Sequence, residues 1–165
     1  MNIEFIRLTE IKKSDIIALM NNPKVLNHMP LALAHFGEEE YDKFINEKKN
    51  IWKEHGYGPW AFIANGNFIG WGGLQPEHND IEIALVLHPN FWGIGKTIYD
   101  KIIHYAFEDL HLKSVIVLLP LTRKHVKGLL KLGFEKDGNL EIDGKLFLCY
   151  RLSVLKYNSK KKFKS

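Results

Sequence analysis

A glycine-rich turn leading into a helix, Gly93 to Thr97 in the stretch PNFWGIGKT, is the part of the sequence with the most evident chemistry. Its two glycines let the backbone come close to a ligand. A helix that begins near Lys96 presents free amides and the positive end of its dipole to an anion. The pattern predicts a seat for phosphate groups, carried either by a nucleoside triphosphate or by another molecule.

The nucleotide interpretation rests on Gly95-Lys96-Thr97, which matches the end of the P-loop pattern G-x-x-x-x-G-K-[ST]. The match is incomplete, because the place of the first glycine is taken by Asn90. The strand that would carry a magnesium-binding aspartate, SVIVLLP, has none. A diphosphate bound without metal needs only the glycines and the helix amides, and we favour that interpretation. A nucleotide-binding phosphotransferase remains the less favoured alternative.

The elements that must position this turn are indicated by hydrophobic periodicity and by turn residues. Asn65-Gly66 predicts a tight hairpin turn, and Pro89 stops the strand before the glycine turn. The order of strands and helices indicates one mixed α/β domain. The predicted strands lie near Ile3 and over 59–64, 67–76, 80–88, 113–120 and the end of 133–153, and the predicted helices over 14–20, 37–56, 95–112 and 123–133.

Composition excludes several classes of protein. The chain has 165 residues, 45% of them hydrophobic, with no apolar run long enough to span a membrane and no signal-peptide pattern, so we expect a cytoplasmic protein. Five lysines in the last ten residues account for the formal net charge of +4, which is −1 without them. Residues 154–165 are therefore predicted to be a basic, disordered tail, and we expect no nucleic-acid partner. The single cysteine and the scattered histidines predict no metal site.

Four segments in the same order resemble the GCN5-related N-acetyltransferases, the GNAT family. LVLHPNFWGIGKT is similar to their acetyl-CoA motif Q/R-x-x-G-x-G/A, with Trp92 at the first place, Gly95 at the glycine and Thr97 at the last small residue. The other three segments look like the branch of the ribosomal-protein alanine N-acetyltransferases: RLTEIKKSDIIALMNNPKVLNHM, GPWAFIANGNFIGWGGL and LLKLGFEKDG. The resemblance covers residues 1–153.

The resemblance implies a fold and a cofactor. The fold is a mixed, mostly antiparallel seven-stranded sheet with helices on both faces, in which the fourth and fifth strands splay apart. Acetyl-CoA is the implied acetyl donor, and its pantetheine arm pairs with the splayed strand. The residues implied to bind it are Leu85, Val86, Leu87, Trp92, Gly93, Ile94, Gly95, Lys96, Thr97 and Thr122. The amide of Leu87 is the implied donor to the thioester carbonyl.

Direct transfer to an amine requires a base, and Glu82 is the candidate. The family often has a glutamate at this place of the strand. By alternation Glu82 faces away from the side that carries Ile81 and Ile83, and a carboxylate among apolar neighbours tends to have a raised pKa. A hydrogen-bonded structural carboxylate is the competing interpretation of Glu82.

The sequence departs from the family at the residues that protonate the departing thiolate of coenzyme A. The family's Asn-x-x-Ser becomes Thr122 and His125, and the usual tyrosine place is Leu129. His125 is the candidate acid, although a solvated surface residue is the simpler interpretation. Tyr57 and Trp60 are candidates for shaping the substrate entrance.

These observations predict an N-acetyltransferase that acts on a primary amine, either of a small molecule or of a protein N-terminus, as a monomer or a homodimer. The main alternative is a catalytically degenerate domain that binds acyl-CoA or a protein partner, because the usual acid residues are missing.

Overall fold

The computed structural model describes residues 2–32 and 35–164 as a mixed α/β protein with a seven-stranded, mostly antiparallel sheet. The strand order is β1-β2-β3-β4-β5-β7-β6, and β4 and β5 are the parallel pair. The chain forms two compact units, one of residues 1–75 and 84–93 and the other of residues 76–83 and 94–165. No helix among the described residues combines the length and the apolar character needed to cross a bilayer.

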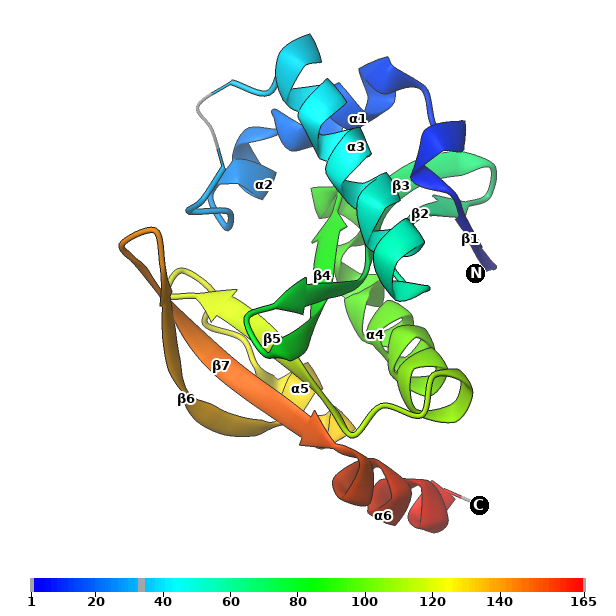
Figure 1. Ribbon diagram of the computed structural model, residues 1–165, viewed down its shortest axis with the longest axis vertical. Coiled ribbons are helices and arrows are strands. Elements are labelled where there is room, and N and C mark those ends of the chain that lie inside the picture. The colour runs from blue at the N-terminus through cyan, green and yellow to red at the C-terminus, as the bar shows by residue number, and fades with distance from the viewer. Residues whose placement is uncertain (1, 33–34, 165) are drawn as a thin grey trace. The chain divides into compact units, whose positions relative to one another are not determined.

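The first unit begins with the short strand β1, and Figure 1 shows its helices beside its strands. Strand β1 pairs with β2, and β2 pairs with β3, both antiparallel. Asn65 and Gly66 connect β2 to β3 with φ angles of 51° and 79°, which is the left-handed backbone expected of a two-residue hairpin turn. Its elements are β1 (Ile3–Ile6), η1 (Leu8–Glu10), α1 (Lys13–Met20), α2 (Pro23–Leu26), α3 (Glu38–His55), β2 (Pro59–Ala64) and most of β3 (Asn67–Glu77).

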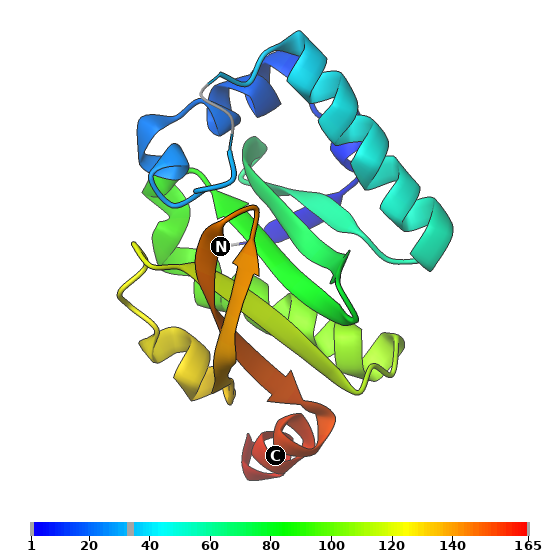
Figure 2. The same ribbon diagram turned by 60° about the vertical axis from the view of Figure 1, so that its left-hand side comes forward.

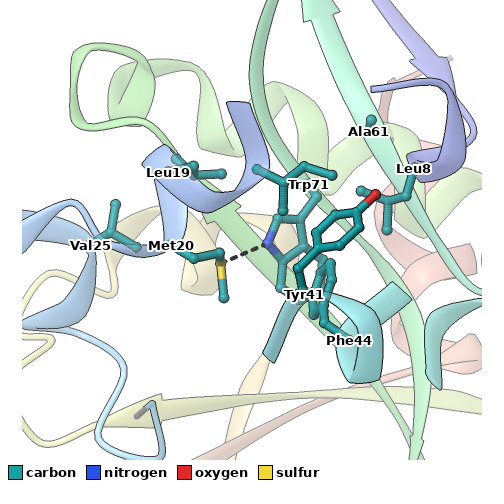
Figure 3. Packing of buried hydrophobic residues seen from close by; sticks show 9 residues of the cluster. Leu8, Leu19, Met20, Val25, Tyr41, Phe44, Ala61 and Trp71 are labelled. Atoms are coloured by element: carbon teal, nitrogen blue, oxygen red, sulfur yellow. Dashed lines mark hydrogen bonds between the residues drawn. The ribbon is translucent and has the colours of Figure 1, made fainter. Parts of the chain in front are cut away.

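The core of the first unit is an apolar cluster between its helices and strands (Figure 3). Trp71 of β3 is 4% exposed, and its indole Nε1 donates to the sulfur of Met20 at 3.4 Å. Phe44 of α3 meets the ring of Trp71 edge-on, with centroids 5.0 Å apart. Large apolar side chains from α1, α3, β2 and β3 thus pack together away from water, and their burial stabilises the first unit.

Strand β4 (Asp80–Leu87) contributes its second half to the first unit, where it lies against the glycines of β3. A Cβ atom on Gly72 would be 2.4 Å from the carbonyl oxygen of Ala84, and one on Gly70 would be 2.3 Å from that of Val86. The two backbones therefore come closer than any larger residue allows. The carbonyl groups of Ala84 and Val86 both face β3.

The second unit holds the other half of the sheet. Strand β5 (Ser114–Pro120) pairs with β7 (Lys145–Ser153) and β7 with β6 (Glu135–Ile142), all antiparallel, as Figure 2 shows. Helix α4 (Gly95–His104) buries Ile98 and Ile102, which are both 0% exposed. Its helical path continues into the π-helical turn η3 (Tyr105–Asp109). The unit is completed by α5 (Lys127–Leu132) and α6 (Val154–Lys164).

The structure differs from the sequence predictions in three places. Helix α5 begins only at Lys127, and residues 123–126 are irregular. Strand β6 is exposed and polar, so it lacks the apolar alternation that predicts a strand, and its pairing with β7 holds it in place. Residues 154–164, expected to be a disordered tail, form helix α6, in which Tyr157 stacks on Phe107 and Lys161 pairs with Glu108 at 2.7 Å.

Candidate active site

The second half of β4 presents alternate backbone groups to opposite sides. Because the amide and the carbonyl of one strand residue point the same way and successive residues alternate, Ala84 and Val86 face β3 with both groups. The amide of His88, one step further in the same alternation, donates to the carbonyl of Ile69 at 2.8 Å. The amides of Leu85 and Leu87 therefore point away from β3.

This alternation separates the three residues that were expected to bind the pantetheine arm. Leu85 and Leu87 have amides on the side that β3 does not use, whereas the amide of Val86 is directed at β3. The side chain of Leu87 is 5% exposed, so this residue has only its backbone to offer a ligand. Two of the three expected amides are thus directed away from the neighbouring strand.

The turn after β4 is hydrogen-bonded to the end of that strand. In η2 (Pro89–Ile94) the indole Nε1 of Trp92 donates to the carbonyl oxygen of Leu87 at 2.9 Å. Trp92 is 45% exposed, and its ring meets that of His28 edge-on, with centroids 5.6 Å apart. The amide of Asn90 donates to Nδ1 of His88 at 3.2 Å. The end of β4 and the beginning of the glycine turn are thereby held as one piece.

The glycine turn and the helix that follows suit an anion. A Cβ atom on Gly93 would meet nothing within 4 Å, so the space beside this residue is open to a ligand. Helix α4 begins at Gly95, its N-cap residue Ile94 makes no side-chain capping hydrogen bond, and its first turn contains no acidic residue. Lys96 and Thr97 are exposed there. These residues fit the diphosphate of acetyl-CoA, since the first-turn amides and the helix dipole both favour negative charge.

Glu82 lies in the first half of β4, in the second unit, opposite Ile116 of β5. The buried hydroxyl of Tyr99, on α4, lies close enough to respond to its charge. Burial raises the pKa of Tyr99 to about 12, with Arg123 lowering the pKa and Glu82 raising it. The structure thus brings Glu82, Tyr99 and Arg123 into one electrostatic neighbourhood. Local residue spacing does not indicate this grouping, because Tyr99 lies on α4 and Glu82 on β4.

The remaining predicted residues lie elsewhere. Thr122 and His125 are both exposed in the irregular segment between β5 and α5. Tyr57 is 8% exposed and stacks on His55, with ring centroids 5.3 Å apart. Trp60 packs against Phe5 and Trp52. These contacts place Tyr57 and Trp60 in aromatic packing of the first unit, so an entrance role for them stays a prediction.

A groove of about 720 Å³ lies in the first unit and contains none of the predicted site residues. Arg7, Lys48 and Trp52 are among its lining residues, and the guanidinium of Arg7 lies 4.2 Å from the centroid of the Trp52 ring. Among the described residues, no three histidine, cysteine, aspartate or glutamate side chains are grouped so that they could hold a metal ion.

Comparison with known families identifies the class of protein to which this fold belongs. Residues 5–135 match the family model described as the acetyltransferase (GNAT) domain. The chain therefore belongs to the GNAT acetyltransferases. It is an N-acetyltransferase, and the acetyl donor of this family is acetyl-CoA.

Solved structures share the fold over nearly the whole chain. Spermidine N-acetyltransferase from Vibrio cholerae, in complex with CoA and spermine, is 18% identical, covers 95% of this chain and 97% of its own, and superposes with a TM-score of 0.72. The aminoglycoside acetyltransferase AAC(6')-Ib in complex with coenzyme A is 10% identical, with 97% and 98% covered and a TM-score of 0.75.

A curated relative is similar over a shorter stretch. FsC-acetyl coenzyme A-N(2)-transacetylase from Aspergillus fumigatus is 34% identical over an alignment that covers 37% of this chain and 31% of that protein. The match therefore extends over about a third of that relative, and it does not bring the relative's substrate to this chain.

Proposed function

We propose that this protein transfers the acetyl group of acetyl-CoA directly to the primary amine of a small molecule, without a covalent enzyme intermediate. Membership of the GNAT family supports the donor and the type of reaction. The observation that carries the proposal is the direction of the β4 amides, because Leu85 and Leu87 turn theirs away from β3 while the strand is held against Gly70 and Gly72.

In this proposal the backbone does most of the binding. The amide of Leu85 holds the pantetheine arm, and the amide of Leu87 donates to the thioester carbonyl and stabilises the negative charge that develops there. The Trp92 indole secures the Leu87 carbonyl and so fixes the plane of the following peptide. The first-turn amides of α4, with the open backbone at Gly93, hold the diphosphate.

Glu82 is the proposed general base. An amine attacks only when it is uncharged, so the carboxylate of Glu82 accepts the proton that the amine must lose. The amine nitrogen then forms its bond to the carbonyl carbon, the carbon–sulfur bond breaks, and coenzyme A leaves as the thiol after gaining a proton. His125 is the proposed donor of that last proton, because its exposed imidazole can both accept and donate a proton.

The acceptor is proposed to be a small amine. The support is that two proteins with the same fold are named for such acceptors, spermidine in one case and an aminoglycoside in the other. The resemblance to the ribosomal-protein branch favours a protein N-terminus instead. A panel that contains spermidine, kanamycin and a peptide with an N-terminal alanine distinguishes the two classes.

The first experiment is thermal denaturation of the purified protein with acetyl-CoA, coenzyme A, or ATP with magnesium. We expect a rise in melting temperature that saturates with acetyl-CoA concentration, as binding to the folded state alone requires. Stabilisation by ATP with magnesium but not by acetyl-CoA would favour the nucleotide alternative.

The second experiment measures thiol release with the amine panel. Glu82→Gln should lower kcat at least 100-fold, in the range expected for loss of a general base. Glu141→Gln, at an exposed position of β6, is the matched control and should leave kcat unchanged. Acetyl-CoA binding without turnover of any amine would favour the degenerate binding domain. Full activity of Glu82→Gln would remove Glu82 from the mechanism.

A further inference from the structure

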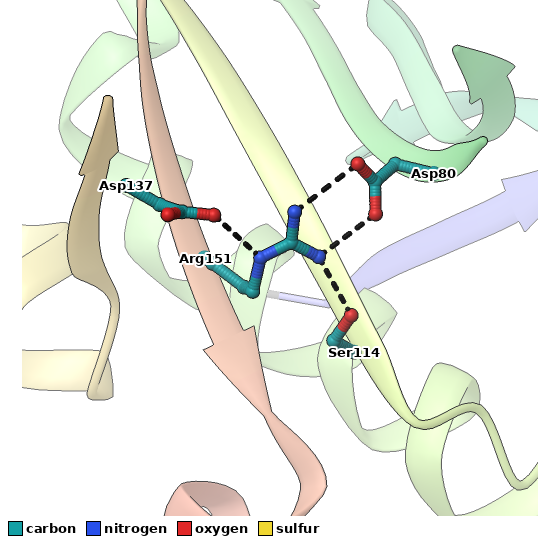
Figure 4. A network of polar contacts seen from close by, with 4 residues as sticks. All are labelled: Asp80, Ser114, Asp137 and Arg151. Carbon is teal, nitrogen blue, oxygen red and sulfur yellow. Dashed lines mark hydrogen bonds and ion pairs between the residues drawn. The ribbon is translucent and has the colours of Figure 1, made fainter. Parts of the chain in front are cut away.

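One arginine joins the four strands of the second unit. The guanidinium of Arg151, on β7, donates from Nη1 and Nη2 to the two carboxylate oxygens of Asp80 at 2.8 and 3.1 Å (Figure 4). It also donates from Nε to Asp137 on β6 at 2.7 Å and from Nη1 to Ser114 on β5 at 2.9 Å. Asp80 is the first residue of β4, so the pair with Asp80 reaches across β5.

The strand register places Glu82 on the same face as this network. Glu82 is paired with Ile116 of β5, and Ile116 is paired with Arg151 of β7. Paired residues of neighbouring strands share a face, so Glu82 and Arg151 lie on the same face of the sheet. Their backbones are two strand spacings apart, which is roughly 10 Å. Asp80 precedes Glu82 by two residues and shares that face as well.

The thiol of Cys149 lies close to the same charged groups. Cys149 lies on β7 two residues before Arg151. Burial is the main cause that raises the pKa of this thiol, and the negative charges of Asp137, Asp80 and Glu82 raise the pKa further, while Arg151 lowers it. One side chain thus lies within electrostatic reach of all four groups. Tyr99 of α4 also responds to the charge of Glu82.

The attachment of β4 to β5 is otherwise slight. Among the described residues, Glu82 with Ile116 is the one register pair between these strands. A bidentate arginine–carboxylate pair holds its partners in a fixed geometry, which a single hydrogen bond does not do. The Asp80–Arg151 pair therefore adds a side-chain restraint to the first half of β4, two residues from the proposed base.

We propose that Arg151 is a positioning residue for the acetyl transfer, which through Asp80 fixes the strand segment that carries Glu82 and whose cation favours the ionised form of that carboxylate. The inference rests on the proposed function, in which Glu82 is the base. Arg151 itself touches no reacting atom. The contact with Asp80 and the positive charge can be separated, because a lysine at this position retains the charge and loses the bidentate contact.

The first readout is independent of catalysis. Amide hydrogen exchange of residues 80–87 should become at least tenfold faster in Arg151→Gln and in Arg151→Lys, because both release Asp80. Asp137→Asn removes the other carboxylate of the network and leaves the contact with Asp80, so exchange of β4 should stay as in the wild type. Stabilisation by acetyl-CoA establishes that each variant is folded. If Arg151→Gln does not fold, Asp80→Asn takes its place in this measurement.

The second readout is the pH profile of kcat/KM with acetyl-CoA and the best amine of the panel. Arg151→Gln removes the positive charge that contacts Asp80, two residues from Glu82, so the acid limb should move to higher pH by about 0.3 pH unit or more. Arg151→Lys should leave the limb in place. A merely stabilising arginine would lower the melting temperature and leave the limb where it is.

The results separate this inference from the proposed function. Absence of turnover with every amine would overturn the proposed function. Full activity of Glu82→Gln would overturn the role of Glu82 as the base, and this inference with it, while the acetyl transfer itself would stand. Loss of activity in Glu82→Gln, together with wild-type β4 exchange and an unmoved acid limb in Arg151→Gln, would overturn the positioning role alone. Faster β4 exchange with an acid limb that moves in Arg151→Gln but not in Arg151→Lys would support it.

Discussion

Replacement of Gly72 by alanine is the most direct test of the close contact between β3 and β4. The added Cβ would lie 2.4 Å from the carbonyl oxygen of Ala84 and 3.1 Å from the Cα of Leu85. Ordinary van der Waals contact begins at about 3.4 Å, so the strands must separate by about 1 Å. Both neighbours are backbone atoms, and no change of side-chain rotamer relieves the overlap.

The expected loss of free energy of unfolding follows from this overlap. Overpacking of a tightly packed site costs about 1–3 kcal/mol, and a rigid backbone neighbour favours the upper part of that range. For a chain of this size each kcal/mol lowers the melting temperature by about 2–4 °C. Gly72→Ala should therefore melt about 4–10 °C below the wild type. It should also gain less stability from acetyl-CoA, because Leu85 and Leu87 belong to the displaced strand.

Calorimetry or circular dichroism with and without acetyl-CoA makes the measurement. Gly128→Ala is the matched control, because its Cβ would meet nothing within 4 Å and it lies inside helix α5. Alanine at a helical position of this kind stabilises by about 0.5–1 kcal/mol, so its melting temperature should be equal or slightly higher. A melting temperature of Gly72→Ala within 1 °C of the wild type would refute the close contact.

Three further predictions concern the glycine turn, the acid stability and an irregular segment. Gly93→Ala should keep the wild-type melting temperature, because its Cβ meets no protein atom, and should weaken acetyl-CoA binding about tenfold or more in a thermal titration; unchanged binding would place the diphosphate elsewhere. The hydrogen bonds from Arg151 lower the pKa of Asp80, so the stability from this carboxylate is present above its unfolded pKa near 3.8 and is lost as the pH falls through the lower folded value. The melting temperature should therefore fall less steeply between pH 6 and pH 2 for Asp80→Asn than for the wild type. An equal fall in both proteins would contradict this linkage between the pKa of Asp80 and stability. Asn21→Ala should destabilise by about 2–3 kcal/mol in urea unfolding, because its amide donates to and accepts from the backbone of Phe36; a loss below 0.5 kcal/mol would contradict this.

Local signals in the sequence were sufficient for most of the fold. The helix over Glu38–His55 and the hairpin around Asn65-Gly66 were predicted from residue spacing and turn chemistry, and the structure confirms both. Strand β6 was missed, because its stability comes from hydrogen bonds to β7 rather than from an apolar face. Helix α6 was missed for a similar reason, since a contact such as Tyr157 on Phe107 joins positions that are distant in the sequence.

The candidate site was predicted unevenly. The glycine turn, its helix and the position of Glu82 in a strand follow from residue types and spacing. Arg151 and Asp80 were not singled out, although an arginine within the apolar run LFLCYRLS is a signal that asks for a buried partner. The partner itself, 71 residues away, is not indicated by any local pattern.

By itself the sequence determined the family, most of the elements and the glycine turn that we expect to bind an anion, because these depend on short-range spacing and on the conformational freedom of glycine. Only the tertiary structure decided which β4 amides point away from β3, and that Arg151 pairs with Asp80 on the strand that carries Glu82. Both depend on the register between strands that are far apart in the chain. Register is set by the packing of the whole sheet, and a shift of one residue would reverse every amide in question.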